Sequence, residues 1–135
     1  CTVGHATELK NCILIDTAQA PHFAYVGDSI LGRGVNLGAG ARLSNVPVTS
    51  VRDPATGKRP SIRIKIEGKE YDTGLPKFGA VIGDGCQIGC NVVTNPGTLI
   101  GKNTLVYPNL SLKKGLYPAN SIIKLMQQVV AVDRK

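Results

Sequence analysis

The chain has 135 residues, of which 42% are hydrophobic, and carries a formal net charge of +7. This length suits one domain at most, and 16 glycines with two Phe and no Trp favour thin, repeated layers over one bulky core. Neither a membrane span of about 18 apolar residues nor a secretory signal is readable, so we expect a soluble, cytoplasmic protein.

Four cysteines, Cys1, Cys12, Cys86 and Cys90, raise the question of disulfides or a zinc site. Their spacing includes no CxxC and the chain has only two histidines, so we predict reduced, mostly buried thiols and no metal. Six of the sixteen basic residues lie between Arg52 and Lys69, without the interleaved aromatics that stack on nucleic-acid bases. We therefore expect a phosphorylated small molecule as the anionic partner, and neither nucleic acid nor membrane.

Apolar residues recur every six positions along three stretches of the chain. They are Val3, Leu9 and Ile15, then Leu31, Leu37 and Leu43, and then Ile82, Ile88, Thr94, Ile100, Val106 and Leu112. Neither an α-helix nor an ordinary strand has this period. It is typical of a parallel β-helix, in which six residues form one face and its corner and roughly 18 residues form a coil.

Between Ile15 and Leu31 the six-residue period slips by two residues, and the sequence HFAYVGD at 22–28 lies inside the slip. An irregularity within a repeat is where a functional site is expected. This directs attention to His22, for which two interpretations are open. It is either a catalytic base or a corner histidine whose ring donates to a backbone carbonyl.

The period disappears from about residue 47 to 75. Ile62, Ile64 and Ile66 alternate with polar residues before a turn at Glu67–Gly68, which predicts a β-hairpin extruded from a corner after a Pro/Gly-rich loop. Such an excursion is an active-site lid or a contact with a neighbouring subunit, with a solvated loop as the alternative.

At the C-terminal end, apolar residues within 122–130 follow a helical spacing after Asn120 and Ser121. We therefore predict a β-helix over residues 1–117 and a C-terminal helix or tail over 118–135 that covers the last coil. Because Val3 and Gly4 already belong to the repeat, we expect the natural chain to extend further toward the N-terminus.

Four motifs carry a resemblance to a known family: HFAYVGD, VNLGAG at 35–40, Asn45, and PKFGAVIGD at 76–84. Together they resemble the left-handed β-helix domain of the bifunctional UDP-N-acetylglucosamine pyrophosphorylase/glucosamine-1-phosphate N-acetyltransferases, over residues 3–46 and 76–112. The resemblance implies an all-β, left-handed parallel β-helix that forms a homotrimer. It also implies acetyl transfer from acetyl-CoA to the amino group of a hexosamine 1-phosphate, with glucosamine 1-phosphate first, for UDP-N-acetylhexosamine synthesis.

The resemblance assigns roles residue by residue. His22 matches the catalytic base, and Glu8 matches a glutamate near it. Substrate-binding positions are matched by Lys10, Tyr25, Asn36 and Lys77, and coenzyme-binding positions by Ala39, Asn45 and Cys90, the last in place of a serine. Lys113 and Lys114 are further candidates for the phosphates of the coenzyme, or else belong to a solvated end of the coil.

These residue types suit direct amine acetylation. A hexosamine ammonium must lose a proton before it attacks a thioester, and a neutral imidazole, with an ordinary pKa of about 6.5, accepts it near neutral pH. No enzyme nucleophile is needed because the amine attacks directly. A backbone N–H of the Gly38–Gly40 turn or of the Cys90 corner would hold the oxyanion, and the sequence leaves both open.

Two departures from the family pattern favour a different function. Val46 stands where the family commonly has an aromatic residue near the coenzyme, and an arginine that grips the sugar phosphate would lie upstream of Cys1. The alternative is a non-catalytic β-helix that trimerises and steadies a sugar-1-phosphate nucleotidylyltransferase. The insertion also resembles a branch of the family with looser sugar preference. Trimerisation has one physical reason as well, since a thin coil leaves an apolar outer face for a neighbour to cover.

Overall fold

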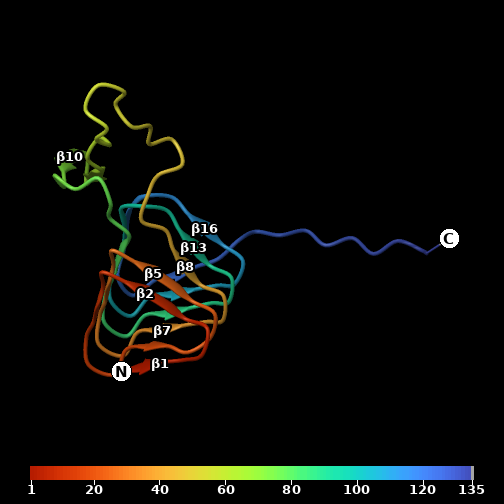
Figure 1. Ribbon diagram of the computed structural model, residues 1–135. Coiled ribbons are helices and arrows are strands. Elements are labelled where there is room, and N and C mark those ends of the chain that lie inside the picture. The colour runs from red at the N-terminus through yellow and green to blue at the C-terminus, as the bar shows by residue number, and fades with distance from the viewer. Residues whose placement is uncertain (135) are drawn as a thin grey trace.

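A computed structural model of the chain describes residues 1–134, and over that range it contains strands and no helix. Three parallel sheets hold six, five and five strands, and a separate antiparallel pair forms a hairpin. The chain passes from one sheet to the next and stacks coil upon coil, as Figure 1 shows. This is a left-handed parallel β-helix, which confirms the predicted fold class.

The strands are short and are named here by sheet. Sheet A contains β1 (Thr2–Val3), β4 (Gln19–Ala20), β7 (Asn36–Leu37), β12 (Gln87–Ile88), β15 (Leu105–Val106) and β18 (Ile122–Ile123). Sheet B contains β2 (Glu8–Lys10), β5 (Tyr25–Gly27), β8 (Arg42–Leu43), β13 (Val93–Thr94) and β16 (Ser111–Leu112). Sheet C contains β3 (Ile13–Leu14), β6 (Ile30–Leu31), β11 (Ala80–Ile82), β14 (Thr98–Ile100) and β17 (Gly115–Tyr117).

Three corners join the sheets and carry most of the candidate residues. The first corner, from sheet A to sheet B, consists of residues 4–7, 21–24, 38–41, 89–92 and 107–110. The second corner, from sheet B to sheet C, consists of residues 11–12, 28–29, 95–97 and 113–114, together with the insertion that begins at residue 44 and ends at 79. The third corner returns the chain to sheet A.

The core is a column of aliphatic side chains along the axis of the coil. Strand residues alternate between inside and outside, and parallel pairing places each inward residue above its counterpart in the coil below. The predicted positions Leu31, Leu37 and Leu43 are fully buried, and Ile82 and Ile88 are at most 2% exposed. The six-residue period therefore marks the buried residues correctly from Leu31 onward.

The first coil departs from the prediction. Ile15 is 41% exposed, and Leu14 instead pairs with Leu31 and packs against the core. The inward residues step by five from Leu9 to Leu14, and again by five from Val26 to Leu31. The two-residue slip is thus two contractions of one residue each, and both lie at the second corner.

The predicted hairpin is confirmed. Strands β9 (Arg63–Ile66) and β10 (Lys69–Asp72) pair antiparallel, and the turn residues Glu67 and Gly68 both have positive φ, as a two-residue hairpin turn requires. Ile62 and Ile64 are each 4% exposed, and a Cβ at Gly97 would lie 3.1 Å from Ile64 Cγ1. The insertion therefore packs on the second corner rather than standing free in solvent.

The predicted C-terminal helix is wrong. Ile122 and Ile123 form β18 and pair with Leu105 and Val106 at the open edge of sheet A. Residues 124–134 form no regular structure and lead away from the coil in Figure 1, with Met126 90% exposed. Ile122 and Ile123 belong to the apolar pattern but are hydrogen-bonded at the edge of the sheet. The segment that remains is too short to be a stable helix alone. Lys135 lies outside the described residues.

Within residues 1–134 there is also no helix long and apolar enough to cross a membrane.

The core column predicts a large and local stability effect. Leu37→Ala should lower the free energy of unfolding by about 2–5 kcal/mol, because a cavity opens between two stacked coils. Leu105→Ala, on the outer face of sheet A and 40% exposed, is the matched control and should cost about 0.5 kcal/mol. Urea denaturation of the two variants measures both values, and equal losses would contradict the assigned core.

Candidate functional site

The first corner aligns three of the predicted site residues in one column. The N–H of Gly40 donates to the carbonyl of His22 at 3.0 Å, and that of Asn91 donates to the carbonyl of Ala39 at 2.9 Å. One coil further, the N–H of Asn109 donates to the carbonyl of Cys90 at 3.0 Å. His22, Ala39 and Cys90 therefore occupy equivalent positions in successive coils, and His5 occupies the same position one coil earlier.

Local backbone geometry turns the His22 side chain outward. Pro21 fixes the chain before it, and Phe23 after it has a φ of +51° and is 66% exposed. The corner fits because Gly4 has no side chain, since a Cβ there would lie 1.6 Å from the carbonyl oxygen of Pro21. Within residues 1–134 the imidazole makes no hydrogen bond, so in this chain the ring does not cap a carbonyl.

The outer face of sheet B carries the next two candidates. Glu8 pairs with Tyr25, and Tyr25 pairs with Arg42, so these three side chains are neighbours on one face. The Tyr25 side chain extends along its strand and reaches Gly27. A Cβ at Gly27 would lie 2.6 Å from Tyr25 Oη and 2.8 Å from Asn45 Nδ2, so the absence of a side chain there leaves room for both groups. Tyr25 thus starts near the first corner and reaches toward the second.

A polar ladder closes the second corner. Asp28 accepts one hydrogen bond from Asn11 Nδ2 at 2.6 Å and another from Asn45 Nδ2 at 2.5 Å. Asn45 is 8% exposed, and its carbonyl accepts the N–H of Phe78, where the insertion returns. The sequence predicts that Asn45 lines the coenzyme site, but within one chain it lies at the opposite end of sheet B from Ala39 and Cys90.

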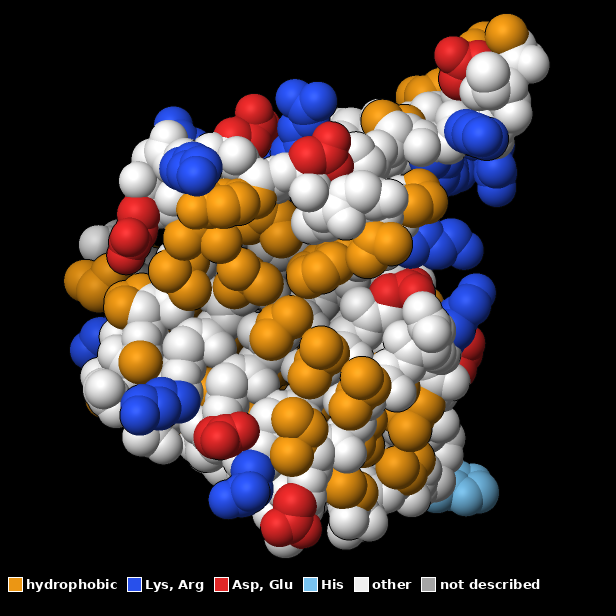
Figure 2. All heavy atoms as spheres, turned by 90° about the vertical axis from the view of Figure 1, so that its left-hand side faces the viewer, with side chains coloured by type: hydrophobic (Ala, Val, Ile, Leu, Met, Phe, Trp, Pro, Cys, Tyr) orange, Lys and Arg blue, Asp and Glu red, His pale blue; other side chains and the backbone are white. Residues whose placement is uncertain are grey.

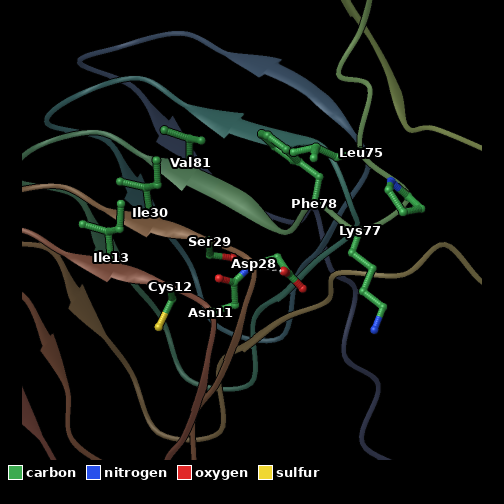
Figure 3. A pocket seen from close by; sticks show the side chains of 11 residues that line it. Asn11, Cys12, Ile13, Asp28, Ser29, Ile30, Leu75, Lys77, Phe78 and Val81 are labelled. Carbon is green, nitrogen blue, oxygen red and sulfur yellow. Dashed lines mark hydrogen bonds between the residues drawn. The ribbon is translucent and has the colours of Figure 1, made fainter.

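A cavity of about 460 Å³ opens beside this ladder. Figure 3 shows its apolar wall, formed by Ile13, Ile30 and Val81 on three neighbouring strands of sheet C, with Lys77 on the far side. Asp28 and Asn11 line it as well. The arrangement offers an apolar surface, a carboxylate, an amide and a cation, which suits a small polar molecule.

The cysteines differ from the expectation of mostly buried thiols. All four are free, but Cys1 and Cys90 are exposed, Cys12 is half-buried and only Cys86 is buried. A short repeat leaves corner positions open to solvent, which explains the exposure of Cys90. Burial raises the pKa of the Cys12 thiol at the cavity, and burial also raises the pKa of Cys86, so neither is a thiolate near neutral pH.

Residues 1–134 contain no group of three or more His, Cys, Asp or Glu side chains placed to hold a metal ion.

The comparisons with known proteins agree with this architecture. The family model described as bacterial transferase hexapeptide (six repeats) matches residues 79–114. A bifunctional sugar-1-phosphate nucleotidylyltransferase/acetyltransferase of Sulfurisphaera tokodaii is 31% identical over 78% of this chain and 24% of the relative. The bifunctional protein GlmU of Methanococcus maripaludis strain C5 is 31% identical over 98% of this chain and 30% of the relative. The chain belongs to this family of hexapeptide-repeat transferases.

A third relative in the family, the bifunctional protein GlmU of Methanococcus vannielii, is 30% identical over 95% of this chain and 28% of its own length. The chain thus spans between 24% and 30% of the length of these three relatives. Their names describe bifunctional proteins, and the segment shared with this chain is the β-helix described above.

The remaining candidate residues lie toward both ends of sheet B. Asn36 faces outward on sheet A, in register with Gln19 and Gln87, just before the first corner. Lys10 is exposed at the end of β2 that leads to the second corner. Lys113 and Lys114 are exposed at the same corner, and Lys114 lines a separate cavity of about 410 Å³ under the insertion.

One chain therefore holds two groups of candidates rather than one site. His22, Ala39 and Cys90 share the first corner, with Glu8, Tyr25 and Asn36 close to it in the chain. Lys10, Asn45, Lys77, Lys113 and Lys114 lie at the second corner. Sequence reasoning missed Asn11 and Asp28, although a signal was available. Asn11, Asp28 and Asn45 are spaced by 17 residues, the same interval that separates His5, His22 and Ala39.

The ladder at the second corner predicts coupled stability effects. Asp28→Ala should lower the free energy of unfolding by about 1–3 kcal/mol, because the buried amide of Asn45 loses its acceptor. Asn45→Ala made in the Asp28→Ala background should then cost less than it does alone. Urea denaturation of the two single variants and the double variant measures the coupling.

Asp16→Ala serves as the control, because Asp16 is exposed and its nearest cation, Arg33 Nε, is 4.0 Å away. It should change the free energy of unfolding by no more than about 0.5 kcal/mol. The same small change for Asp28→Ala would show that the ladder contributes nothing.

Proposed function

We propose that the chain is the acetyltransferase part of a protein that moves an acetyl group from acetyl-CoA to the amino group of a hexosamine 1-phosphate, with glucosamine 1-phosphate as the first candidate. The observation that carries this proposal is the exposed, unbonded imidazole of His22 in line with Ala39 and Cys90 at the first corner. The motif resemblance and the family membership support the same reaction. The product would enter UDP-N-acetylhexosamine synthesis.

Each step of the reaction has a candidate group in this chain. His22 takes a proton from the substrate ammonium, and the free amine then attacks the thioester carbonyl. The new N–C bond forms as the C–S bond breaks, and the coenzyme leaves as a thiol after it takes up a proton. Glu8 matches the glutamate that the family has near the base. Tyr25 and Asn36 would orient the sugar, and Ala39, Asn45 and Cys90 would line the coenzyme site.

We infer that the complete site needs more than one copy of the chain. The lysines proposed for the substrate phosphate, Lys10 and Lys77, lie at the second corner, whereas the proposed base lies at the first. A groove between two copies would bring the first corner of one against the second corner of the next. The site residues then argue for a homotrimer as the working form.

An apolar ladder on sheet C supports this assembly. The outward residues of its five strands are Ile13, Ile30, Val81, Leu99 and Leu116. Ile13 is 59% and Leu116 is 47% exposed, and Figure 2 shows apolar side chains gathered on the side of the molecule that carries the insertion. Monomeric proteins rarely expose a continuous apolar face of this kind. In a cyclic trimer each copy would cover this ladder of its neighbour with the side that carries the first corner.

A second candidate function is a non-catalytic β-helix that only trimerises and steadies a sugar-1-phosphate nucleotidylyltransferase. Two observations favour it. Val46 offers no aromatic surface to the coenzyme, and the amide of Asn45 is already bonded to Asp28. We favour catalysis because neither observation affects His22. We also propose that the protein works in the cytoplasm, where four free thiols fit a reducing compartment.

The base assignment predicts a difference between the two histidines of the first corner. His22→Ala should lower kcat for acetyl transfer by about 10²–10⁴-fold, because the ammonium then loses its proton acceptor. His5→Ala removes the same side chain one coil earlier and should keep near-normal turnover. The assay follows thiol release from acetyl-CoA with a panel of hexosamine 1-phosphates, using the full-length protein.

Near-normal turnover in His22→Ala would refute the base assignment. Thiol release with none of the amino sugars, while the protein is folded, would favour the non-catalytic function.

The apolar ladder predicts the oligomeric state. Leu99→Glu places a charge at the centre of sheet C and should convert the trimer to monomers, because burying an unpaired carboxylate is costly. Leu105→Glu, on the outer face of sheet A, should leave the trimer intact. Light scattering after size-exclusion chromatography measures the mass, and dissociation by both variants or by neither would exclude sheet C as the interface.

A further inference from the structure

The insertion lines a further cavity, which is basic, and of its charged residues only Lys77 has a role in the acetyl-transfer site proposed above. Its volume is about 400 Å³, and its charged lining residues are Arg52, Lys58, Arg59 and Lys77. No Asp or Glu is among the described residues that line it. Three of the four cations come from the loop before the hairpin and the fourth from the segment after it, so the fold of the insertion itself gathers them.

Two neutral backbone carbonyls hold the arginines in place. Arg52 Nη1 donates to the carbonyl of Gly57 at 2.8 Å, and Arg59 Nη1 donates to the carbonyl of Ser50. A carbonyl orients a guanidinium without neutralising it. Because each guanidinium has five N–H donors, both arginines keep several donors for a ligand. Arg59 is also half-buried, which limits its rotamers.

The acidic groups nearest in the chain are engaged elsewhere. Asp53 accepts the N–H groups of Ala55 and Thr56, each at 2.8 Å. Asp72 accepts the N–H of Gly74 at 2.9 Å and lies 3.5 Å from Arg63 Nε. The ion pairs among residues 1–134 involve Arg33 and Arg63 but none of the four cations of the cavity. Within the described chain, no carboxylate forms an ion pair with the cations of the cavity.

The basic cavity adjoins the cavity at the polar ladder. Pro76 and Lys77 belong to the lining of both, so they form a wall between a basic compartment and one with apolar, amide and carboxylate groups. A molecule with phosphate groups at one end and an uncharged polar part at the other matches the two compartments in order. The forked guanidinium geometry also favours phosphate over a simple halide ion.

We propose that the insertion forms a phosphate-binding site, with Arg52, Arg59, Lys58 and Lys77 contacting the phosphate groups of a phosphorylated small molecule. The site shares Lys77 with the acetyl-transfer site proposed above, and the choice between its two candidate ligands rests on that proposed function. Two ligands share this chemistry, a sugar 1-phosphate and the phosphorylated nucleotide end of coenzyme A. In either case the insertion supplies guanidinium groups, which the matched lysines, Lys10 and Lys77, do not.

The probe for the site is inorganic pyrophosphate, titrated by calorimetry into the full-length protein at low ionic strength, where charge screening is weak. Arg52→Gln and Arg59→Gln should each weaken binding by at least about tenfold, because each removes a charge-assisted hydrogen-bonding group. Lys65→Gln is the matched control. It removes one positive charge from an exposed position of the same insertion outside the cavity and should change binding less than about twofold.

Arg59→Lys keeps the charge without the fork and should bind more weakly than the wild type but more tightly than Arg59→Gln, which separates ligand contact from a folding defect of the loop. Displacement of pyrophosphate by glucosamine 1-phosphate would assign the site to the sugar phosphate, and displacement by coenzyme A would assign it to the coenzyme. Absence of pyrophosphate binding, an equal loss in Lys65→Gln, or displacement by neither ligand would overturn the proposal. If the wild-type protein binds pyrophosphate but transfers no acetyl group, the result would count against the proposed reaction and not against the phosphate site.

Discussion

Hydrogen-bonded register between successive coils is the constraint on which this structure depends. Each two- or three-residue strand has almost no stability alone and is held by the coils above and below it. The register therefore determines which residues stack, and the corners of successive coils must be able to stack at the same spacing. A Cβ at Gly38 would lie 2.6 Å from the backbone nitrogen of Cys90, so the corners approach too closely for a side chain there. The column that contains His22 is a consequence of this stacking.

The three corners do not share variation in length equally. Three one-residue contractions, after Leu9, Val26 and Leu112, lie at the second corner, and so does the insertion. The first corner keeps the same number of residues in every described coil. A change of length there would shift His22 relative to Ala39, whereas a change at the second corner is absorbed before the chain re-enters sheet C. The irregularity in the period thus lies at the second corner, beside the His22 column and not within it.

The six-residue period was enough to predict the β-helix and most of the buried residues, and the alternation of Ile62, Ile64 and Ile66 was enough to predict the hairpin, because both patterns are local. It could not distinguish Leu14 from Ile15, since both are aliphatic and only pairing with Leu31 decides between them. The C-terminal helix was mispredicted because Ile122 and Ile123 fit a helical face and a strand equally well. The resemblance matched Asn45 to a coenzyme site. Its hydrogen bond to Asp28 was not predicted, because it forms only when a coil of 17 residues places the two side chains next to each other. Contacts between coils, such as the bond between Asp28 and Asn45, are not written in any local pattern, nor are contacts between distant parts of the insertion, such as the basic cavity.

A scaffold with fixed register has few places where new chemistry can be added. Substitution of an outward residue on a strand changes only its own contacts, but a strand cannot be lengthened without disturbing the coil above. The insertion avoids this limit, because it leaves the coil after Asn45 and returns at Phe78, whose N–H bonds to the carbonyl of Asn45. Its arginines are oriented by carbonyls of the insertion itself, Gly57 and Ser50, rather than by the β-helix. The ligand preference of the insertion can therefore change by substitution within the loop while the His22 column keeps its geometry.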